Sequence, residues 1–236
     1  MPQITTLTFF RYPDFSSRVW GFMMMQFSHS YLQQVKGQSF YKLMGSGKGE
    51  GFNPFPDWSV YSLLQVWENE AAAQAFFEEA PIMQKYRKHA SETWTIFMKS
   101  ILAKGLWSGK NPFQESSSLS QKIPYLAVIT RATIKASRLI PFWRYVPKSQ
   151  KQLSASQGLL FAKGIGEVPV VQMATFSLWE NSEAMKAFAY KGKGHQGAIK
   201  KTRELDWYKE ELFSRFQPYK SVGLWNGINP LADLAN

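Results

Sequence analysis

The chain contains one pattern twice, and this internal repeat limits the folds that it can adopt. A Trp-Glu-Asn triplet begins at Trp67 and again at Trp179, an offset of 179 − 67 = 112 residues. Later in each copy, a Gly-Leu-Trp-x-Gly-x-Asn-Pro motif contains Trp107 and Trp225, an offset of 225 − 107 = 118 residues. A unit of roughly 110 residues is the size of a small domain and is too long for a solenoid repeat. We therefore expect two similar halves that pack face to face, with a short insertion in the second.

Each half predicts the element order β-α-β-β-α-β. In the first half, alternating or branched residues predict strands over 5–12, 39–44, 58–67 and 94–103, and helical spacing predicts helices over 15–35, 70–79 and 82–92. In the second half the predicted strands cover 125–132, 159–163, 170–179 and 212–222, and the predicted helices cover 139–146, 183–190 and 195–206. Tandem ferredoxin-like units of this kind can join their sheets. The predicted fold class is therefore α+β, a fused dimeric α+β barrel (a pseudo-dimer) with outer helices and an interior pocket.

Three segments follow from the repeat. We predict an N-terminal ferredoxin-like repeat over 1–113, a linker over 114–122 that contains three consecutive serines, and a C-terminal ferredoxin-like repeat over 123–236.

Composition excludes several classes of protein. Of the 236 residues, 44% are hydrophobic and 16% aromatic, which is enough for a core and argues against general disorder. No apolar run reaches the ~20 residues that span a bilayer, and the N-terminus does not resemble a signal peptide. The absence of cysteine excludes disulfides and thiolate ligands. These features predict a cytoplasmic protein.

The net charge of +11 is unevenly distributed. Between positions 116 and 166 the chain carries eight Lys or Arg residues and no acid. Such a stretch suits an anionic lipid surface or an anionic cofactor, although a solvated basic face is its ordinary explanation. The chain contains no helix-turn-helix, zinc-finger or RNA-binding signature, so we expect no nucleic-acid partner.

Among the three histidines, His29, His89 and His195, only His195 has an unusual context. It follows Gly192-Lys193-Gly194 and precedes Gln196-Gly197, which leaves room for a large flat group to approach. No cluster of His, Asp and Glu has metal-site spacing, so a cofactor that supplies most of its own ligands, such as haem, is the simplest metal site. Arg131, Arg144 and Lys163 could then pair with the haem propionates. An ordinary surface or core role for His195 stays open at this point.

Two other segments have both a functional and a structural interpretation. Residues 45–51 are rich in glycine around Lys48, but the Ser or Thr that follows the lysine of a phosphate loop is missing, so a tight connection between strands is the better interpretation. The aromatic and methionine residues of 19–27 could line the passage of a long apolar substrate, or could be a helix face packed on the sheet.

Taken together, several motifs resemble those of the spheroidene monooxygenase family of acyclic carotenoid 2-ketolases, and the likeness extends from about residue 5 to about residue 230. The motifs are Phe40-Tyr41-Lys42-Leu43, Phe142-Trp143-Arg144, Lys163-Gly164-x-Gly166-Glu167, His195-x-Gly197-Ala198-Ile199 and Trp207-Tyr208-x-Glu210-Glu211. The resemblance implies an enzyme that binds haem b and uses O2 and reduced ferredoxin. Such an enzyme hydroxylates C-2 of an acyclic carotenoid twice, and loss of water leaves a ketone. His195 stands in a family motif and inherits the role of axial haem ligand.

The resemblance also implies partners. We expect an acyclic carotenoid substrate, a ferredoxin-type electron donor and peripheral attachment to the inner face of the cytoplasmic membrane through the basic face, and the pseudo-dimer could itself form a homodimer. Two alternatives stay open: a cofactor-free or other haem-using enzyme of the same barrel class, and a non-catalytic haem or lipid carrier.

Overall fold

The computed structural model describes residues 2–49, 53–150, 153, 155–191 and 206–234. For residues 145–150, 190 and 191 it describes the backbone alone. The first half contains β1 (Ile4–Arg11), α1 (Phe15–Phe27), α2 (His29–Leu32), β2 (Gln38–Gly47), β3 (Pro56–Trp67), α3 (Glu70–Glu79), α4 (Pro81–His89) and β4 (Glu92–Gly105). The second half contains β5 (Leu126–Ile134), the 3-10 helix η1 (Ala136–Arg138), α5 (Leu139–Gln150), β6 (Leu159–Val168), β7 (Gln172–Trp179), α6 (Ser182–Lys191), β8 (Tyr208–Gly223) and the 3-10 helix η2 (Ala232–Leu234).

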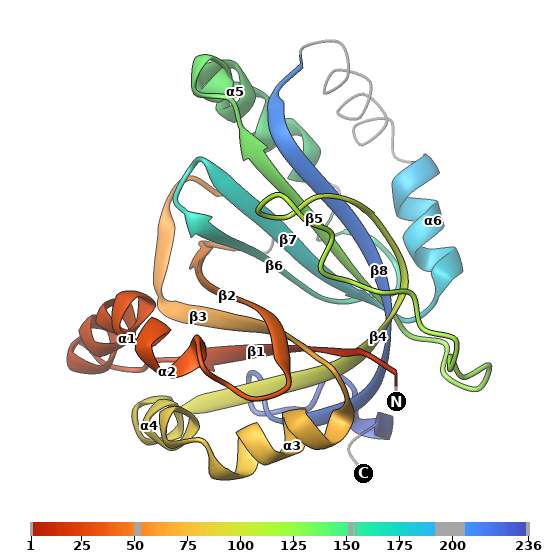
Figure 1. Ribbon diagram of the computed structural model, residues 1–236. Helices are drawn as coiled ribbons and strands as arrows, with labels where there is room; N and C mark the ends of the chain where they lie inside the picture. Colours follow the sequence, from red (N-terminus) through yellow and green to blue (C-terminus); the bar gives the residue numbers. More distant parts are fainter. Residues whose placement is uncertain (1, 50–52, 151–152, 154, 192–205, 235–236) are drawn as a thin grey trace.

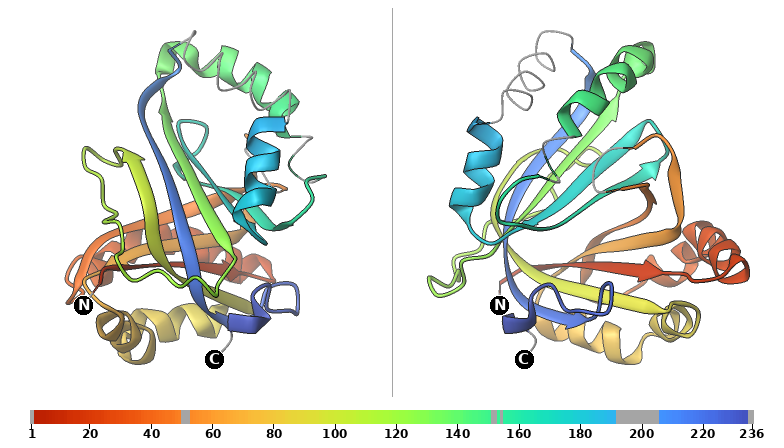
Figure 2. Two further views of the ribbon diagram at one scale, coloured as in Figure 1. Left: turned by 90° about the vertical axis from the view of Figure 1, so that its right-hand side faces the viewer. Right: turned by 180° about the vertical axis from the view of Figure 1, so that it is seen from behind.

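The eight strands form one closed antiparallel barrel in the order β1-β3-β2-β6-β7-β5-β8-β4 (Figure 1). Each half contributes four neighbouring strands, and the halves meet at two seams, β4–β8 and β2–β6. The helices lie outside the barrel (Figure 2). The predicted α+β fold of two ferredoxin-like units is therefore confirmed.

The two seams have very different lengths. At the long seam, β4 pairs with β8 from Trp94↔Gly223 to Gly105↔Leu212, and 223 − 105 = 212 − 94 = 118, the same offset as the sequence motif. At the short seam, β2 and β6 pair only at Gly45↔Gly166 and Ser46↔Ile165 in the described chain. The pseudo-twofold axis that the repeat predicts therefore passes through both seams.

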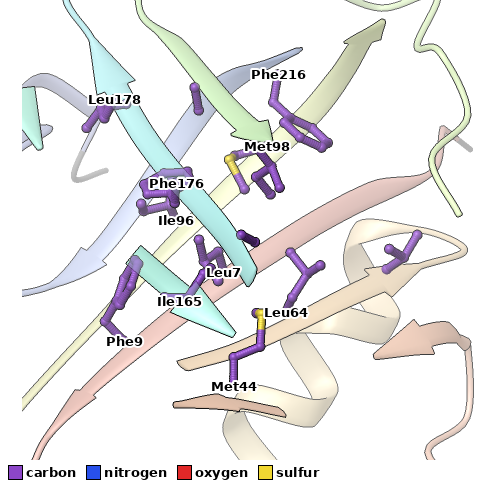
Figure 3. Close-up of a cluster of buried hydrophobic side chains, with 14 of the residues drawn as sticks. Leu7, Phe9, Met44, Leu64, Ile96, Met98, Ile165, Phe176, Leu178 and Phe216 are labelled. Atoms are coloured by element: carbon purple, nitrogen blue, oxygen red, sulfur yellow. The ribbon is translucent and has the colours of Figure 1, made fainter. Parts of the chain in front are cut away.

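Side chains fill the barrel interior. Inward-pointing residues of alternating position from both halves, such as Leu7, Phe9, Ile96, Ile165 and Phe176, form one buried cluster (Figure 3). Strand alternation explains the arrangement, because every second residue points inward. The interior that we predicted to hold a pocket is thus a packed core, and the pocket described below lies beside it.

A second buried cluster attaches the helices of the first half to the outer face of its sheet. Phe10, Leu63 and Trp67 of the strands pack there with Phe76 of α3 and Tyr86 of α4. The helix predicted over 15–35 is in fact two helices, because α1 ends at Phe27 and α2 begins at His29. Ser28 between them is buried, and its hydroxyl accepts a hydrogen bond of 2.6 Å from Tyr86, which fixes the break against α4.

Several strands extend beyond their predicted ends. The glycine-rich residues 45–51 were predicted as a connection, but β2 continues through Gly45 to Gly47, and β6 continues past its predicted end at Lys163 to Val168, because Gly45 and Gly166 pair across the short seam. The segment 114–122 contains no helix or strand and is held against β8, where the Ser120 N–H donates to Oε1 of Gln217. The helix predicted over 195–206 falls largely outside the described residues.

Among the described helices, none combines the length and the apolar character needed to cross a bilayer.

A substitution at Gly105 tests how much the close pairing of β4 with β8 contributes to the free energy of unfolding. The φ of Gly105 is 99°, and a Cβ there would overlap the carbonyl oxygen of Glu211 in β8. Gly109 has a φ of 79°, but no described atom lies within 4 Å of its Cβ position. The positive φ costs an alanine about 1–2 kcal/mol at either site. We expect Gly105→Ala to lower the free energy of unfolding by about 2 kcal/mol more than Gly109→Ala in urea titrations. Equal losses of stability in the two variants would show that β4 and β8 can move apart at Gly105 without cost.

Candidate functional site

A glutamate in each half holds a turn of the other half. Oε1 of Glu210 accepts the N–H of Ser108 at 3.0 Å, and Oε2 accepts the N–H of Gly109 at 2.8 Å. Arg131, buried on β5, forms an ion pair with Glu210 and lies 5.7 Å from the ring centre of Trp107. We call this arrangement the first clamp.

The second clamp repeats the glutamate and the turn of the first at equivalent positions, since 210 − 92 = 227 − 109 = 118, but its arginine stands at a different position of its strand. Oε1 of Glu92 accepts the N–H of Gly227 at 2.8 Å, and Oε2 accepts a hydrogen bond of 2.6 Å from Nε of Arg11. Arg11 also donates to Oδ1 of Asn226 at 2.6 Å and lies 4.3 Å from the ring centre of Trp225. Both turns have positive φ at their central residues, as in the type I′ turns that Asn-Gly favours. The repeated Gly-Leu-Trp-x-Gly motif therefore forms a turn whose backbone N–H groups donate hydrogen bonds to a glutamate of the opposite half.

Burial and hydrogen bonding act in opposite directions on the clamp carboxylates. Burial tends to raise the pKa of Glu210, but the N–H groups of Gly109 and Ser108 and the Arg131 guanidinium outweigh it and lower that pKa. In the same way, burial is outweighed at Glu92 by the Gly227 N–H and by Arg11, and its pKa is lowered. Both carboxylates are therefore ionised at neutral pH.

The first clamp is extended by a further ion pair. Glu167 of β6 accepts hydrogen bonds from Nε1 of Trp107 at 2.6 Å and from Nζ of Lys42 at 2.5 Å. Nη2 of Arg131 lies 3.6 Å from Oε1 of Glu167. Lys42 belongs to β2, so this ion pair crosses the short seam between the halves.

Beside this cluster an open groove of about 800 Å³ lies between α1, α2 and β2. Its apolar wall comes mainly from α1, and its polar groups come from α2, β2 and β6, with Gln26 of α1 and Lys110. The lining residues that matter here are Phe22, Met23, Phe27, His29, Tyr41, Lys42 and Glu167. The groove forms where β2 diverges from β6, since their pairing is limited to Gly45 and Ser46 in the described residues. An apolar groove with a few converging polar groups is the common form of a ligand site.

His29 and Tyr41 form a polar pair within the groove. Nδ1 of His29 lies 2.8 Å from the Tyr41 hydroxyl, so one donates a hydrogen bond to the other. Burial raises the pKa of Tyr41, against a smaller opposing effect of Gln33, so the phenol stays protonated at neutral pH. Sequence analysis missed this pair because the two residues lie on different elements and share no motif.

Of the four residues predicted for haem binding, the structure describes Arg131, Arg144 and Lys163, and each of these lies in a different environment. His195 lies outside the described residues. Arg144 is exposed on α5. Lys163 points from β6 toward Asp57, with 2.9 Å between Nζ and Oδ2, and Arg131 belongs to the first clamp. Both buried cations already have carboxylate partners, although Nε of Arg131 is a buried donor without a hydrogen bond to any described residue, and the proposed contacts stay predictions.

Two further observations concern metal binding. His89, at the end of α4, stacks on Trp20 with ring centres 4.0 Å apart. The described residues contain no group of three or more His, Asp or Glu side chains arranged to hold a metal ion.

Comparison of the sequence with known proteins decides the family. The chain is 37% identical to the spheroidene monooxygenase of Cereibacter sphaeroides over 98% of its own length and 71% of that protein. It is 37% identical to the spheroidene monooxygenase of Rhodobacter capsulatus over 97% of its length and 95% of that protein. The chain belongs to the spheroidene monooxygenase family. The resemblance based on the motifs is thereby confirmed, although no protein-family model matches the chain.

A third family member, from Rubrivivax gelatinosus, is 34% identical over 90% of the chain and 81% of that protein. Among solved structures, aldoxime dehydratase aligns with a TM-score of 0.59 at 8% identity, covering 92% of this chain and 81% of that one. At this identity the likeness concerns the fold alone.

The first clamp can be tested through its acid titration. Since Glu210 has a lowered pKa in the folded state, its stabilising effect is present above its unfolded value of ~4.3 and is lost as pH falls through the folded value. We expect Glu210→Gln to lower the free energy of unfolding by about 1–2 kcal/mol at pH 7, allowing for its partial exposure to solvent. The difference from wild type should shrink between about pH 5 and pH 3. The exposed neighbour Glu211→Gln is the control, and a pH-independent difference would contradict the clamp.

Proposed function

We propose that this chain is a monooxygenase that introduces a keto group at C-2 of an acyclic carotenoid. The proposal rests on the 34–37% identity to three proteins named spheroidene monooxygenase over 90–98% of the chain. Two hydroxylations at the same carbon give a geminal diol, and loss of water from the diol leaves the ketone.

The groove supports an elongated apolar substrate. Phe22, Met23 and Phe27 form an aromatic and thioether wall, and these side chains adapt to a polyene of varied curvature. A volume of about 800 Å³ lies within the range of ligand pockets, and its open end suits a chain that is only partly enclosed.

The polar groups of the groove support the last step of the proposed reaction. Loss of water from a geminal diol needs a group that gives a proton to the departing hydroxyl and a group that accepts one from the other. The His29–Tyr41 pair, at 2.8 Å, can fill these two roles.

Haem b is the proposed cofactor, with O2 and reduced ferredoxin as co-substrates. Bound haem would supply the centre that activates oxygen. His195, taken from the family motif, would hold its iron, and Arg144 on α5 would pair with a propionate. Arg131 and Lys163 suit that role less well, because each is held by a carboxylate. The net charge of +11 suits an acidic electron donor such as ferredoxin.

Product formation tests the proposed function. With haem, O2, reduced ferredoxin and an acyclic carotenoid, we expect a product that contains a C-2 ketone, identified by mass spectrometry and its red-shifted spectrum. Gln26→Trp places a bulky ring in the groove from an exposed lining position, and it should reduce turnover at subsaturating substrate by about tenfold or more. Gln34→Trp, which is exposed and outside the lining, is the matched control.

The outcomes separate the alternatives. A carotenoid that binds without turning over, in the presence of all co-substrates, would identify a carrier. Product formed equally well without haem would identify a cofactor-free enzyme.

The haem ligand can be tested by spectroscopy alone. Protein purified with haem supplied should show a Soret band that shifts on reduction and on addition of CO. We expect His195→Ala to lose the band while its circular dichroism stays unchanged, because the remaining protein contacts do not fix the iron. His89→Ala and His29→Ala should keep it. Full haem occupancy in His195→Ala would exclude His195, and loss in His29→Ala would move the ligand to the groove.

A further inference from the structure

Helix α1 exposes its largest apolar side chains. Phe15, Phe22 and Phe27 retain 82%, 55% and 56% of their accessible surface, and Val19 and Met23 are also exposed. The positions 15, 19, 22, 23 and 27 follow helical spacing, so they form one stripe. Its opposite stripe, Ser17, Gly21 and Met24, is the buried one. An amphipathic helix normally buries its apolar stripe, so α1 has the arrangement of a helix that contacts something outside the protein.

The exposed stripe continues onto neighbouring elements. Trp58 of β3 is 53% exposed, and its ring lies 5.4 Å from that of Phe22. Phe55, just before β3, and Tyr31 of α2 are exposed as well. We call these residues the α1 face: Phe15, Val19, Phe22, Met23, Phe27, Tyr31, Phe55 and Trp58. In Figure 1 the α1 helix lies at the margin of the molecule, where a flat partner can approach it.

The chain around the α1 face is mainly basic, although Asp14 and Asp57 border the face next to Phe15 and Trp58. From position 15 to position 49 the chain contains no Asp or Glu and carries Arg18, Lys36, Lys42 and Lys48. Nζ of Lys85 donates a hydrogen bond of 2.6 Å to the Tyr31 hydroxyl at the edge of the face. Trp and Tyr rings flanked by basic residues are the side chains that favour the boundary between lipid headgroups and acyl chains.

The α1 face is continuous with the groove. Phe22, Met23 and Phe27 belong to both, so each presents one side to solvent and lines the apolar wall with another. An apolar molecule dissolved in a bilayer could pass along these side chains into the groove without crossing water.

We propose that the α1 face docks on the surface of a lipid bilayer that contains anionic lipids, with the mouth of the groove at the headgroup level. The inference deepens and rests on the proposed function, since a carotenoid dissolves in the bilayer. It differs from the surface predicted from the sequence, the acid-free stretch 116–166. Two cations of that stretch, Arg131 and Lys163, are buried in ion pairs and face no membrane.

The test is flotation of the full chain with vesicles of phosphatidylcholine and phosphatidylglycerol that contain no carotenoid. We expect wild type to float and Phe15→Gln/Trp58→Gln to reduce the bound fraction about tenfold or more. Both positions lie outside the groove lining, so the variant keeps every side chain that lines the proposed substrate site. The matched control is Leu119→Gln/Ile140→Gln, which removes two exposed apolar side chains from the stretch 116–166 and should float like wild type.

Three results would overturn the proposal. Wild type that does not float, a Phe15→Gln/Trp58→Gln variant that floats normally, or an equal loss in the control would each exclude the α1 face as the membrane contact. If wild type fails to float but forms a dimer that Phe15→Gln/Trp58→Gln disrupts, the face joins two copies of the chain. Because the vesicles contain no substrate, flotation without ketone formation would leave docking supported and count against the proposed function alone.

Discussion

The barrel depends on two carboxylates that each grip a turn of the opposite half. Glu210 holds the turn at Ser108 and Gly109, and Glu92 holds the turn at Gly227. Charge-assisted hydrogen bonds to backbone N–H groups are stronger than neutral ones and fix geometry as well as distance. Because each clamp joins residues more than 100 positions apart, it opposes separation of the halves at both ends of the long seam. The indole of Trp107, set by the first clamp, then fixes Glu167 at the edge of the groove.

The unequal seams explain why the groove lies where it does. The long seam pairs β4 with β8 along almost their whole lengths, so that side of the barrel is closed. At the short seam the described strands share only two pairs, and the rest of β2 separates from β6. The inward-pointing Lys42 and Glu167 consequently reach the groove, where their ion pair joins the halves. The ion pair of Lys42 and Glu167 therefore lies next to the apolar wall of the groove, at the place where β2 separates from β6.

The repeat predicted the fold, because matching motifs at offsets of 112 and 118 residues need matching elements. It also marked the clamped turns, but not the carboxylates that hold them, since Glu92 and Glu210 lie outside the repeated motif and the family motif at Glu210 gives no sign of the turn that it contacts. Periodicity placed apolar residues on α1 without indicating which stripe faces the sheet. The His29–Tyr41 pair had no signal, because tertiary packing alone brings α2 onto β2. The segment that begins at Gly45 was misjudged as a connection, since strand pairing with Gly166 overrode the turn preference of its glycines.

The two halves of the barrel share a fold but differ in the roles that we propose for them. The first half supplies the groove wall and an exposed aromatic helix, while the glycine-flanked His195 stands in the second half. If His195 holds the haem as proposed, the groove wall and the cofactor ligand come from different halves of the sequence. Gene duplication and fusion would then matter for function, because one half is free to keep an apolar face for the membrane while the other specialises in the cofactor.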